Sequence, residues 1–110
     1  MLTPKKRVNL SSIQPNALAT FYRKLGVTVQ VISEYEDSQM LGDSQACICI
    51  WDENRWGKSG VSCTEVVLQA DDLWEVHRVA DARGIPLEQS DGEILSGTDP
   101  DGNRVICVPA

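Results

Sequence analysis

The chain has 110 residues, a formal net charge of −6 at pH 7 and an isoelectric point near 4.6. This length supports one domain with one hydrophobic core rather than two independent ones. The acidic balance argues against binding to a phosphate backbone, since Lys5-Lys6-Arg7 is the only basic run in the sequence. The sequence also contains no apolar run long enough to span a bilayer and no signal-peptide core, so we expect a cytoplasmic protein.

The first predicted unit begins with a strand over Lys6 to Ser11, where polar and apolar residues alternate. A helix follows over Pro15 to Leu25, because proline suits the first helical position and an apolar stripe recurs at helical spacing. Gly26 suits the end of this helix. Further strands are predicted over Val27 to Ile32, near Tyr35 to Met40, and over Ala46 to Trp51.

A polar, glycine-punctuated segment from Asp52 to Gly60 is predicted to be a linker, after which the pattern restarts. Asp72 is a good helix N-cap, with Glu75 three residues on as in a capping box, and Gly84 suits the helix end. Asp99-Pro100-Asp101-Gly102-Asn103 is predicted to close a tight hairpin. Strands are predicted over Thr64 to Ala70, Ile85 to Glu88, Glu93 to Thr98 and Arg104 to Val108.

The two units match each other at an offset of 58 residues. Val8 meets Val66, Gly26 meets Gly84, and Gln45 to Ile50 meets Asn103 to Val108. Because the same offset aligns a strand, a helix end and a hairpin, the sequence predicts two copies of one β-α-β-β-β unit. We place the first over about residues 5–51, the linker over 52–61 and the second over about 62–109, all within a single domain.

The four cysteines favour reduced core thiols over disulfides. Cys47 and Cys49 share one face of a predicted strand, Cys107 lies on the repeat-equivalent strand, and Cys63 begins another. A Cys-x-Cys spacing is also not the usual spacing of zinc ligands. Buried thiols in a reducing compartment explain these positions most simply.

Three strings together resemble the glyoxalase / bleomycin resistance protein / extradiol dioxygenase superfamily, the vicinal oxygen chelate fold. They are Phe21 to Val27, Ala70 to Leu73, and Asp99 to Asn103, and the resemblance covers nearly the whole chain. It implies an α+β fold of two βαβββ modules that form a paired, curled mixed β-sheet cup with the helices outside. It also implies that enzymes of the family hold a metal ion on four strand positions facing the cup.

Carried onto this chain one at a time, those four positions fall at Arg7, Ile48, Glu65 and Ile106. Only Glu65 is a ligand for a divalent ion, and Lewis-acid catalysis requires enough ligands to hold the ion. His77, the sole histidine, lies on the second predicted helix, where we expect a half-exposed helix residue rather than a ligand. We therefore expect no metal, no cofactor and no catalytic residue at the family site.

Strand alternation assigns the faces of the predicted cup. The residues expected to face away from the cup, toward the helices, include Cys47 and Cys49. The residues expected to face it include Thr28, Ile32, Ala46, Cys63 and Val108. With Trp51 at the end of the first module and Trp56 in the linker, the candidate ligand-binding residues are Arg7, Asn9, Gln30, Ile48, Ile50, Trp51, Trp56, Glu65, Val67, Gln69, Arg104 and Ile106. Apolar walls with a few polar groups are typical of small-molecule sites.

Two features of this site have alternative interpretations. Arg7 and Glu65 occupy repeat-equivalent positions, so they form either an ion pair in place of the metal or two separate solvated charges. Trp56 lies in the linker and either folds over a planar ligand or packs in a subunit interface, while Trp51 covers either the ligand or the sheet edge.

The favoured function is a metal-free small-molecule binding protein of the bleomycin-resistance kind. The alternative is a metal-dependent lyase, isomerase or dioxygenase of the glyoxalase superfamily, and a third possibility is a metal-free enzyme with Glu65 as base. The resemblance further implies a homodimer, in which the linker would be the hinge of a module swap. No nucleic acid or membrane partner is expected.

Overall fold

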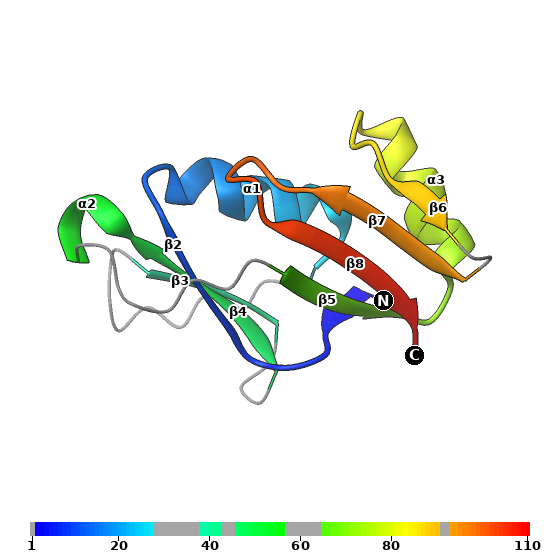
Figure 1. The fold of residues 1–110 in the computed structure, drawn as a ribbon, viewed down its shortest axis with the longest axis horizontal. Helices are drawn as coiled ribbons and strands as arrows, with labels where there is room; N and C mark the ends of the chain where they lie inside the picture. The colour runs from blue at the N-terminus through cyan, green and yellow to red at the C-terminus, as the bar shows by residue number, and fades with distance from the viewer. Residues whose placement is uncertain (1, 28–37, 43–45, 57–64, 91–92) are drawn as a thin grey trace.

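The computed structural model describes residues 2–27, 38–42, 46–56, 65–90 and 93–110. Three helices and eight strands lie in these ranges (Figure 1). In chain order they are β1 Leu2–Pro4, β2 Val8–Ser12, α1 Pro15–Leu25, β3 Ser38–Gly42, β4 Cys47–Asp52, α2 Glu53–Trp56, β5 Glu65–Ala70, α3 Leu73–Ala82, β6 Glu88–Ser90, β7 Ile94–Thr98 and β8 Arg104–Pro109.

The first long helix, α1, has the predicted bounds. Pro15 occupies its first turn, and the apolar stripe is buried through Leu18, Tyr22 and Leu25. Gly26 ends the helix with a φ of 116°, in the left-handed region that glycine adopts without a Cβ penalty. Its N–H donates to the carbonyl of Tyr22, so a helix-end carbonyl is satisfied inside the protein.

The second long helix, α3, begins at the predicted cap. The Asp72 carboxylate accepts hydrogen bonds from the backbone N–H groups of Trp74 and Glu75. These are two of the donors that have no partner within a helix, and a nearby carboxylate also suits the positive end of the helix dipole. Val76 and Ala80 are the buried residues of this helix.

The strands form two mixed sheets with the same local plan. One has the order β1-β5-β8-β7-β6 and the other the order β2-β4-β3. In each, the first strand of a unit pairs in parallel with its last strand, β5 with β8 and β2 with β4, and an antiparallel strand follows on the far side. The predicted α+β architecture is thus confirmed, and both long helices lie on the same side of the strands (Figure 1).

Strand β1 was not predicted. Leu2 to Pro4 pairs antiparallel with β5, and the Lys5 N–H continues the ladder to the Val67 carbonyl at 3.0 Å. The chain then bends, so the strand predicted over Lys6 to Ser11 begins at Val8 and pairs with β4 instead. The amino-terminal residues therefore join the sheet of the second unit, whereas the rest of the first unit builds its own.

Other boundaries also differ from the prediction. Ile85 to Leu87 does not form a strand, because Pro86 lacks an N–H for a ladder and the segment crosses close to Gly97; β6 begins at Glu88. The predicted linker starts with the last residue of β4 and the short helix α2, which polar composition did not reveal. Of the strand predicted from Val27, only Val27 is described, as a bridge to Leu2, and residues 28–32 lie outside the described ranges.

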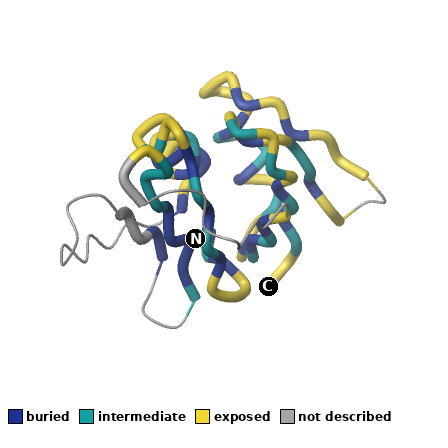
Figure 2. Tube along the Cα trace, turned by 60° about the vertical axis from the view of Figure 1, so that its left-hand side comes forward, coloured by how far each residue is buried: buried dark blue, intermediate teal, exposed yellow. Residues whose placement is uncertain are grey.

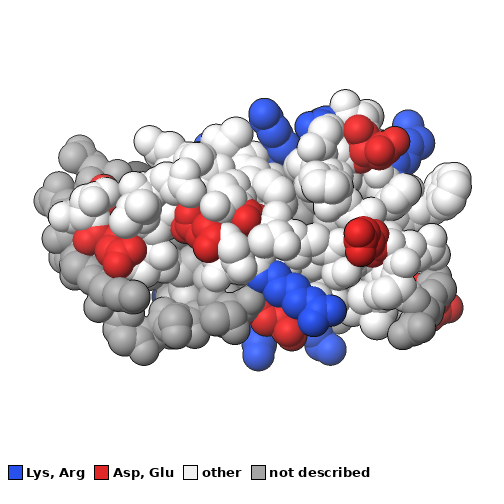
Figure 3. Space-filling view, turned by 45° about the horizontal axis from the view of Figure 1, so that its top comes forward, with Lys and Arg blue, Asp and Glu red and all other residues white. Residues whose placement is uncertain are grey.

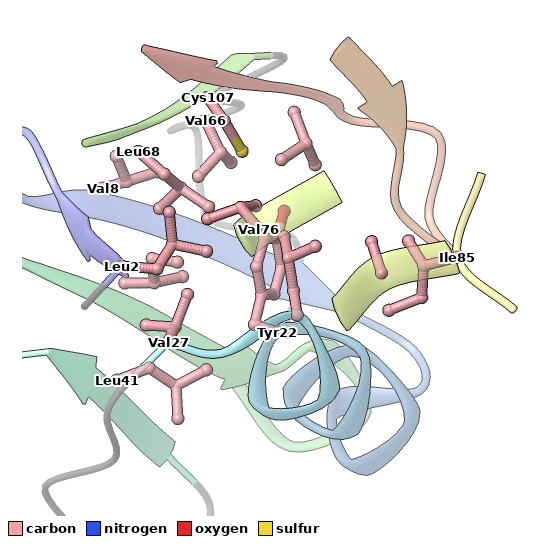
Figure 4. Packing of buried hydrophobic residues seen from close by; sticks show 14 of the residues in the cluster. Leu2, Val8, Tyr22, Val27, Leu41, Val66, Leu68, Val76, Ile85 and Cys107 are labelled. Atoms are coloured by element: carbon pink, nitrogen blue, oxygen red, sulfur yellow. The ribbon is translucent and has the colours of Figure 1, made fainter. Parts of the chain in front are cut away.

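A single hydrophobic cluster joins the two units. It contains Tyr22 from α1, Val66 from β5 and Val76 from α3, all buried, and Figure 4 shows side chains from both units pointing into it. Exposed residues concentrate in turns and along the outer strand β6 (Figure 2). Because both units contribute to one cluster, each depends on the other for its burial.

The predicted hairpin between β7 and β8 is confirmed and is anchored to α1. The Asp99 N–H donates to the Asn103 carbonyl, and the Asp99 carboxylate accepts from the N–H groups of Asp101 and Asn103. The Tyr22 hydroxyl donates to Asp99 Oδ2 at 2.6 Å. A buried acid thus ties this turn to the first helix.

Candidate functional site

The face of the sheet β1-β5-β8-β7-β6 turned away from the helices is the candidate site, and we call it the cup face. Val66, Leu68, Val105 and Cys107 are buried in the core cluster, so the residues alternating with them point the other way. On β5 and β8 the cup face consists of Glu65, Val67, Gln69, Arg104, Ile106 and Val108.

Strand register sets these side chains in three rows. Glu65 lies opposite Arg104, Val67 opposite Ile106, and Gln69 opposite Val108. The middle row is apolar and only half-buried, and the row of opposite charges beside it is exposed. Five of the predicted ligand-binding residues are therefore brought together on one surface.

Residues that the prediction did not include extend the same face onto β7. Ser96 lies opposite Ile106 and Thr98 opposite Arg104. Next to them lies a groove of about 480 Å³, in the volume range of small-molecule pockets. Its lining residues are Pro86, Glu88, Ser96, Gly97, Thr98, Gly102 and Arg104. Alternation within Glu93 to Thr98 was the sequence signal that could have found Ser96 and Thr98.

The prediction that Ile48 and Ile50 face the cup is wrong. Both side chains are fully buried members of the core cluster beneath α1, and they pair with Val8 and Leu10, which belong to the same cluster. Cys49 lies between Ile48 and Ile50 on β4, so its side chain points to the opposite face, and it is buried outside that cluster. The prediction that Cys47 and Cys49 face the helices is therefore also wrong.

On the smaller sheet, the structure brings together two other predicted residues. Asn9 and Trp51 are both half-buried, and the Trp51 indole Nε1–H donates to Asn9 Oδ1 at 3.4 Å. Asn9 is also the register partner of Cys49. This polar contact fixes the indole against the sheet next to the two cysteines.

The remaining predicted residues do not join either group in the described structure. Arg7 is exposed in the bend between β1 and β2, and its ion pair with Glu65 stays a prediction. Trp56 is the last residue of α2 and only its backbone is described. Gln30, Thr28, Ile32 and Cys63 lie outside the described ranges, whereas Ala46 is half-buried just before β4.

His77 lies on α3, half-buried, as expected. It lines a hollow of about 240 Å³ between α3 and the β6–β7 hairpin, together with Trp74, which is 76% exposed. Because this hollow lies on the helix side of the sheet and the cup face lies on the other side, the hollow is not part of the candidate site.

The donor atoms present do not fit a chelated metal ion. With the corrected strand faces, the four family positions fall at Arg7, Cys49, Glu65 and Ile106, which are a cation, a buried thiol, a carboxylate and an aliphatic side chain. Within the described ranges, no group of three or more His, Cys, Asp or Glu side chains is placed to hold a metal ion.

Surface charge and helix length bear on the classes of partner that the composition argues against. On the face shown in Figure 3, acidic and basic side chains are interspersed rather than gathered by sign, unlike the basic stripe of a nucleic-acid binder. Among the described residues, no helix is both long enough and apolar enough to cross a bilayer.

Similarity to known proteins lies in the fold rather than in the sequence. No family model and no curated protein matches the chain. Among solved structures, a lactoylglutathione lyase from Agrobacterium tumefaciens shares 18% identity over 96% of this chain and 92% of that one, with a TM-score of 0.72.

Two further solved structures have a similar fold. A bleomycin resistance determinant encoded on transposon Tn5 shares 22% identity over 97% of this chain and 98% of that one, with a TM-score of 0.65. A glyoxalase/bleomycin resistance protein/dioxygenase from Alicyclobacillus acidocaldarius shares 18% over 94% and 88%, with a TM-score of 0.64. The chain therefore has the vicinal oxygen chelate fold.

Proposed function

We propose that the protein binds a small organic molecule on the cup face without a metal ion, as a sequestering protein of the bleomycin-resistance kind. The observation that carries the proposal is the half-buried apolar row of Val67 and Ile106, flanked by Gln69 on one side and by the Glu65–Arg104 row on the other. An apolar surface with a few charged and amide groups binds a planar body and orients its polar substituents.

The chemistry of the donor set supports binding over metal catalysis. An arginine and an isoleucine at two of the four family positions supply no electron pair to a divalent ion. The likeness to a lactoylglutathione lyase favours the alternative, a metal-dependent enzyme, and metal analysis of the purified protein after dialysis separates the two. One divalent ion retained per chain would overturn the metal-free proposal.

The binding test is a thermal-shift screen with planar cationic antibiotics, bleomycin among them. A ligand that binds only the folded chain stabilises it by about 2.7 kcal/mol at one hundred times its Kd. We expect Ile106→Lys and Glu65→Ala to abolish the shift, because they remove the apolar and the acidic contacts that the cup face offers to a planar cation. Arg78→Ala should leave it intact, because Arg78 lies on the exposed side of α3, beside Glu75.

A screen in which no probe raises the melting temperature would reject this ligand class. A shift that survives both cup-face substitutions would place the ligand elsewhere.

We also propose a homodimer, in which a second copy faces the half-exposed apolar row and encloses the ligand bound on it. Light scattering during size exclusion measures this, and a monomer at micromolar concentration would contradict it. The cytoplasmic location stays a prediction.

A further inference from the structure

Two buried thiols lie side by side on the smaller sheet. The Sγ atoms of Cys47 and Cys49 are 3.5 Å apart, and the residues are 0% and 1% exposed. Residues i and i+2 of a strand share a face, so both thiols lie on the side of β4 opposite Ile48 and Ile50. No part of the proposed function uses them.

We propose that Cys47 and Cys49 form a two-thiolate site for a thiophilic divalent cation, the mercuric ion. Each thiol loses its proton as its sulfur bonds to the ion, so two protons are released for every ion bound. The product, two thiolates and one divalent cation, is electrically neutral, and no atom changes oxidation state.

Charge and ligand number select this class of ion. Thiolates are soft ligands that prefer soft cations. A monovalent ion between two thiolates would leave a net negative charge in a buried position, and burying an uncompensated charge is costly. Zinc takes four ligands in structural sites, whereas the described residues offer no cluster of three or more. A soft divalent ion that is coordinated by two sulfurs gives a neutral site and needs no further ligand.

The neighbouring contacts supply a reporter. Rotation about χ1 of either cysteine would change the distance between the sulfurs without moving the strand. Trp51 follows two residues after Cys49 on the same face, and its indole is held by Asn9. A heavy ion between the thiols would lie close to this ring and quench its fluorescence.

Cys107 is the matched control within the same chain. It is also a fully buried thiol, but it lies alone in the core cluster on the other side of its own sheet. Burial raises the pKa of Cys107 to about 12, and no second cysteine sulfur of the described residues is placed beside it. Burial of a cysteine alone therefore does not make a site.

The experiment titrates the folded protein with mercuric chloride in excess 2-mercaptoethanol, which competes away ions held by one thiol. Cys63 lies outside the described ranges, so every variant carries Cys63→Ser. We expect one ion per chain, with quenching of Trp51 that Trp51→Phe removes. Cys49→Ser and Cys47→Ala should each lower the affinity about 10²–10⁴-fold, through loss of the second thiol's effective concentration. Cys107→Ala should leave it unchanged.

Circular dichroism and the stoichiometry of bound ion decide between this site and an artefact. The protons of Cys47 and Cys49 pass to the two 2-mercaptoethanol thiolates that leave the ion, and one ion retained per chain with an unchanged spectrum supports the site. The proposal is overturned if Cys49→Ser binds as tightly as its parent, if Cys107→Ala loses the ion, or if binding begins only as the spectrum unfolds. Because Cys49→Ser does not alter the cup face of the larger sheet, failure here would not affect the proposed ligand binding.

Discussion

The hydrogen bond from Tyr22 to Asp99 is expected to be a large single contribution to stability. It is 2.6 Å long, and its partners are 0% and 5% exposed, so water does not compete for it. Tyr22→Phe removes the hydroxyl and keeps the ring, including its edge-to-face contact with Phe21 at 5.1 Å between centroids. The change therefore isolates one donor rather than the packing of α1.

The expected loss of stability in Tyr22→Phe depends on the hydrogen bonds that the Asp99 carboxylate keeps. A hydrogen bond to a charged group contributes about 1.5–3 kcal/mol. Asp99 Oδ2 still accepts from Asn103 Nδ2 at 2.9 Å, so the oxygen is not left without a partner. We therefore expect the lower part of this range, about 1.5–2 kcal/mol. In a domain of this size, that lowers the melting temperature by about 4–8 °C for each kcal/mol.

Urea unfolding at pH 7 measures the effect, with an unchanged m-value as evidence that the folded state is still compact. Asp101→Asn is the control: its carboxylate accepts from Gln14 Nε2 at 2.7 Å in an exposed position, where we expect a loss below about 1 kcal/mol. A double-mutant cycle with Asp99→Asn then isolates the pair. Tyr22→Phe within about 0.5 kcal/mol of the parent, or an additive cycle, would refute the reasoning.

Three further predictions test strand faces, close packing and burial. Ile48→Ala should cost about 2–5 kcal/mol, and the half-exposed Ile106→Ala clearly less; equal losses would contradict the corrected faces. Gly97→Ala would set a Cβ 2.9 Å from the Pro86 carbonyl oxygen, and urea unfolding should show a loss of about 1–3 kcal/mol, whereas an unchanged midpoint would contradict this contact. Because burial raises the pKa of Cys107 from 9.0 to about 12, its protonated form stabilises the fold below pH 9, and this contribution declines toward pH 12 by up to about 1.4 kcal/mol per pH unit. Relative to Cys107→Ala, the parent should therefore lose stability between pH 8 and pH 10, and a constant difference would count against the burial.

Features set by neighbouring residues were predictable from the sequence. The bounds of α1 follow from Pro15, the apolar stripe and Gly26, and the start of α3 follows from the Asp72 side chain. The β7–β8 turn follows from its run of Asp, Pro, Gly and Asn. In each case the stabilising contact spans fewer than about five residues, within the reach of local sequence rules.

Features set by distant partners were not predictable. Leu2-Thr3-Pro4 is too short to give a strand pattern, and it is ordered by Gln69 and its neighbours, far along the chain. Helix α2 is a single turn in a polar segment, which composition alone assigns to a linker. Residue types told us that Arg104 and Ile106 could contact a ligand, but only the register with β5 and β7 places them beside Thr98 and Ser96.

The wrong faces in the first unit have a definite cause in strand register. The repeat at 58 residues aligns Ile48 with Ile106, and alternation then places both in the cup. In the structure Val8 of β2 pairs with Ile48 of β4. Val66 is the repeat-equivalent of Val8, and the repeat would pair it with Ile106. It pairs instead with Val105, one residue earlier. A slip of one residue moves every side chain of a strand to the other face.

This slip makes the two halves of the cup chemically different. The second unit turns Val67 and Ile106 outward, an apolar surface for an organic ligand, whereas the first unit buries its isoleucines under α1 and places Cys47 and Cys49 on the opposite side. Because of this slip, the position of β4 that corresponds to Ile106 of β8 is Cys49 rather than Ile48. The two units therefore offer a thiol and an aliphatic side chain at equivalent places, and neither is a carboxylate or imidazole ligand.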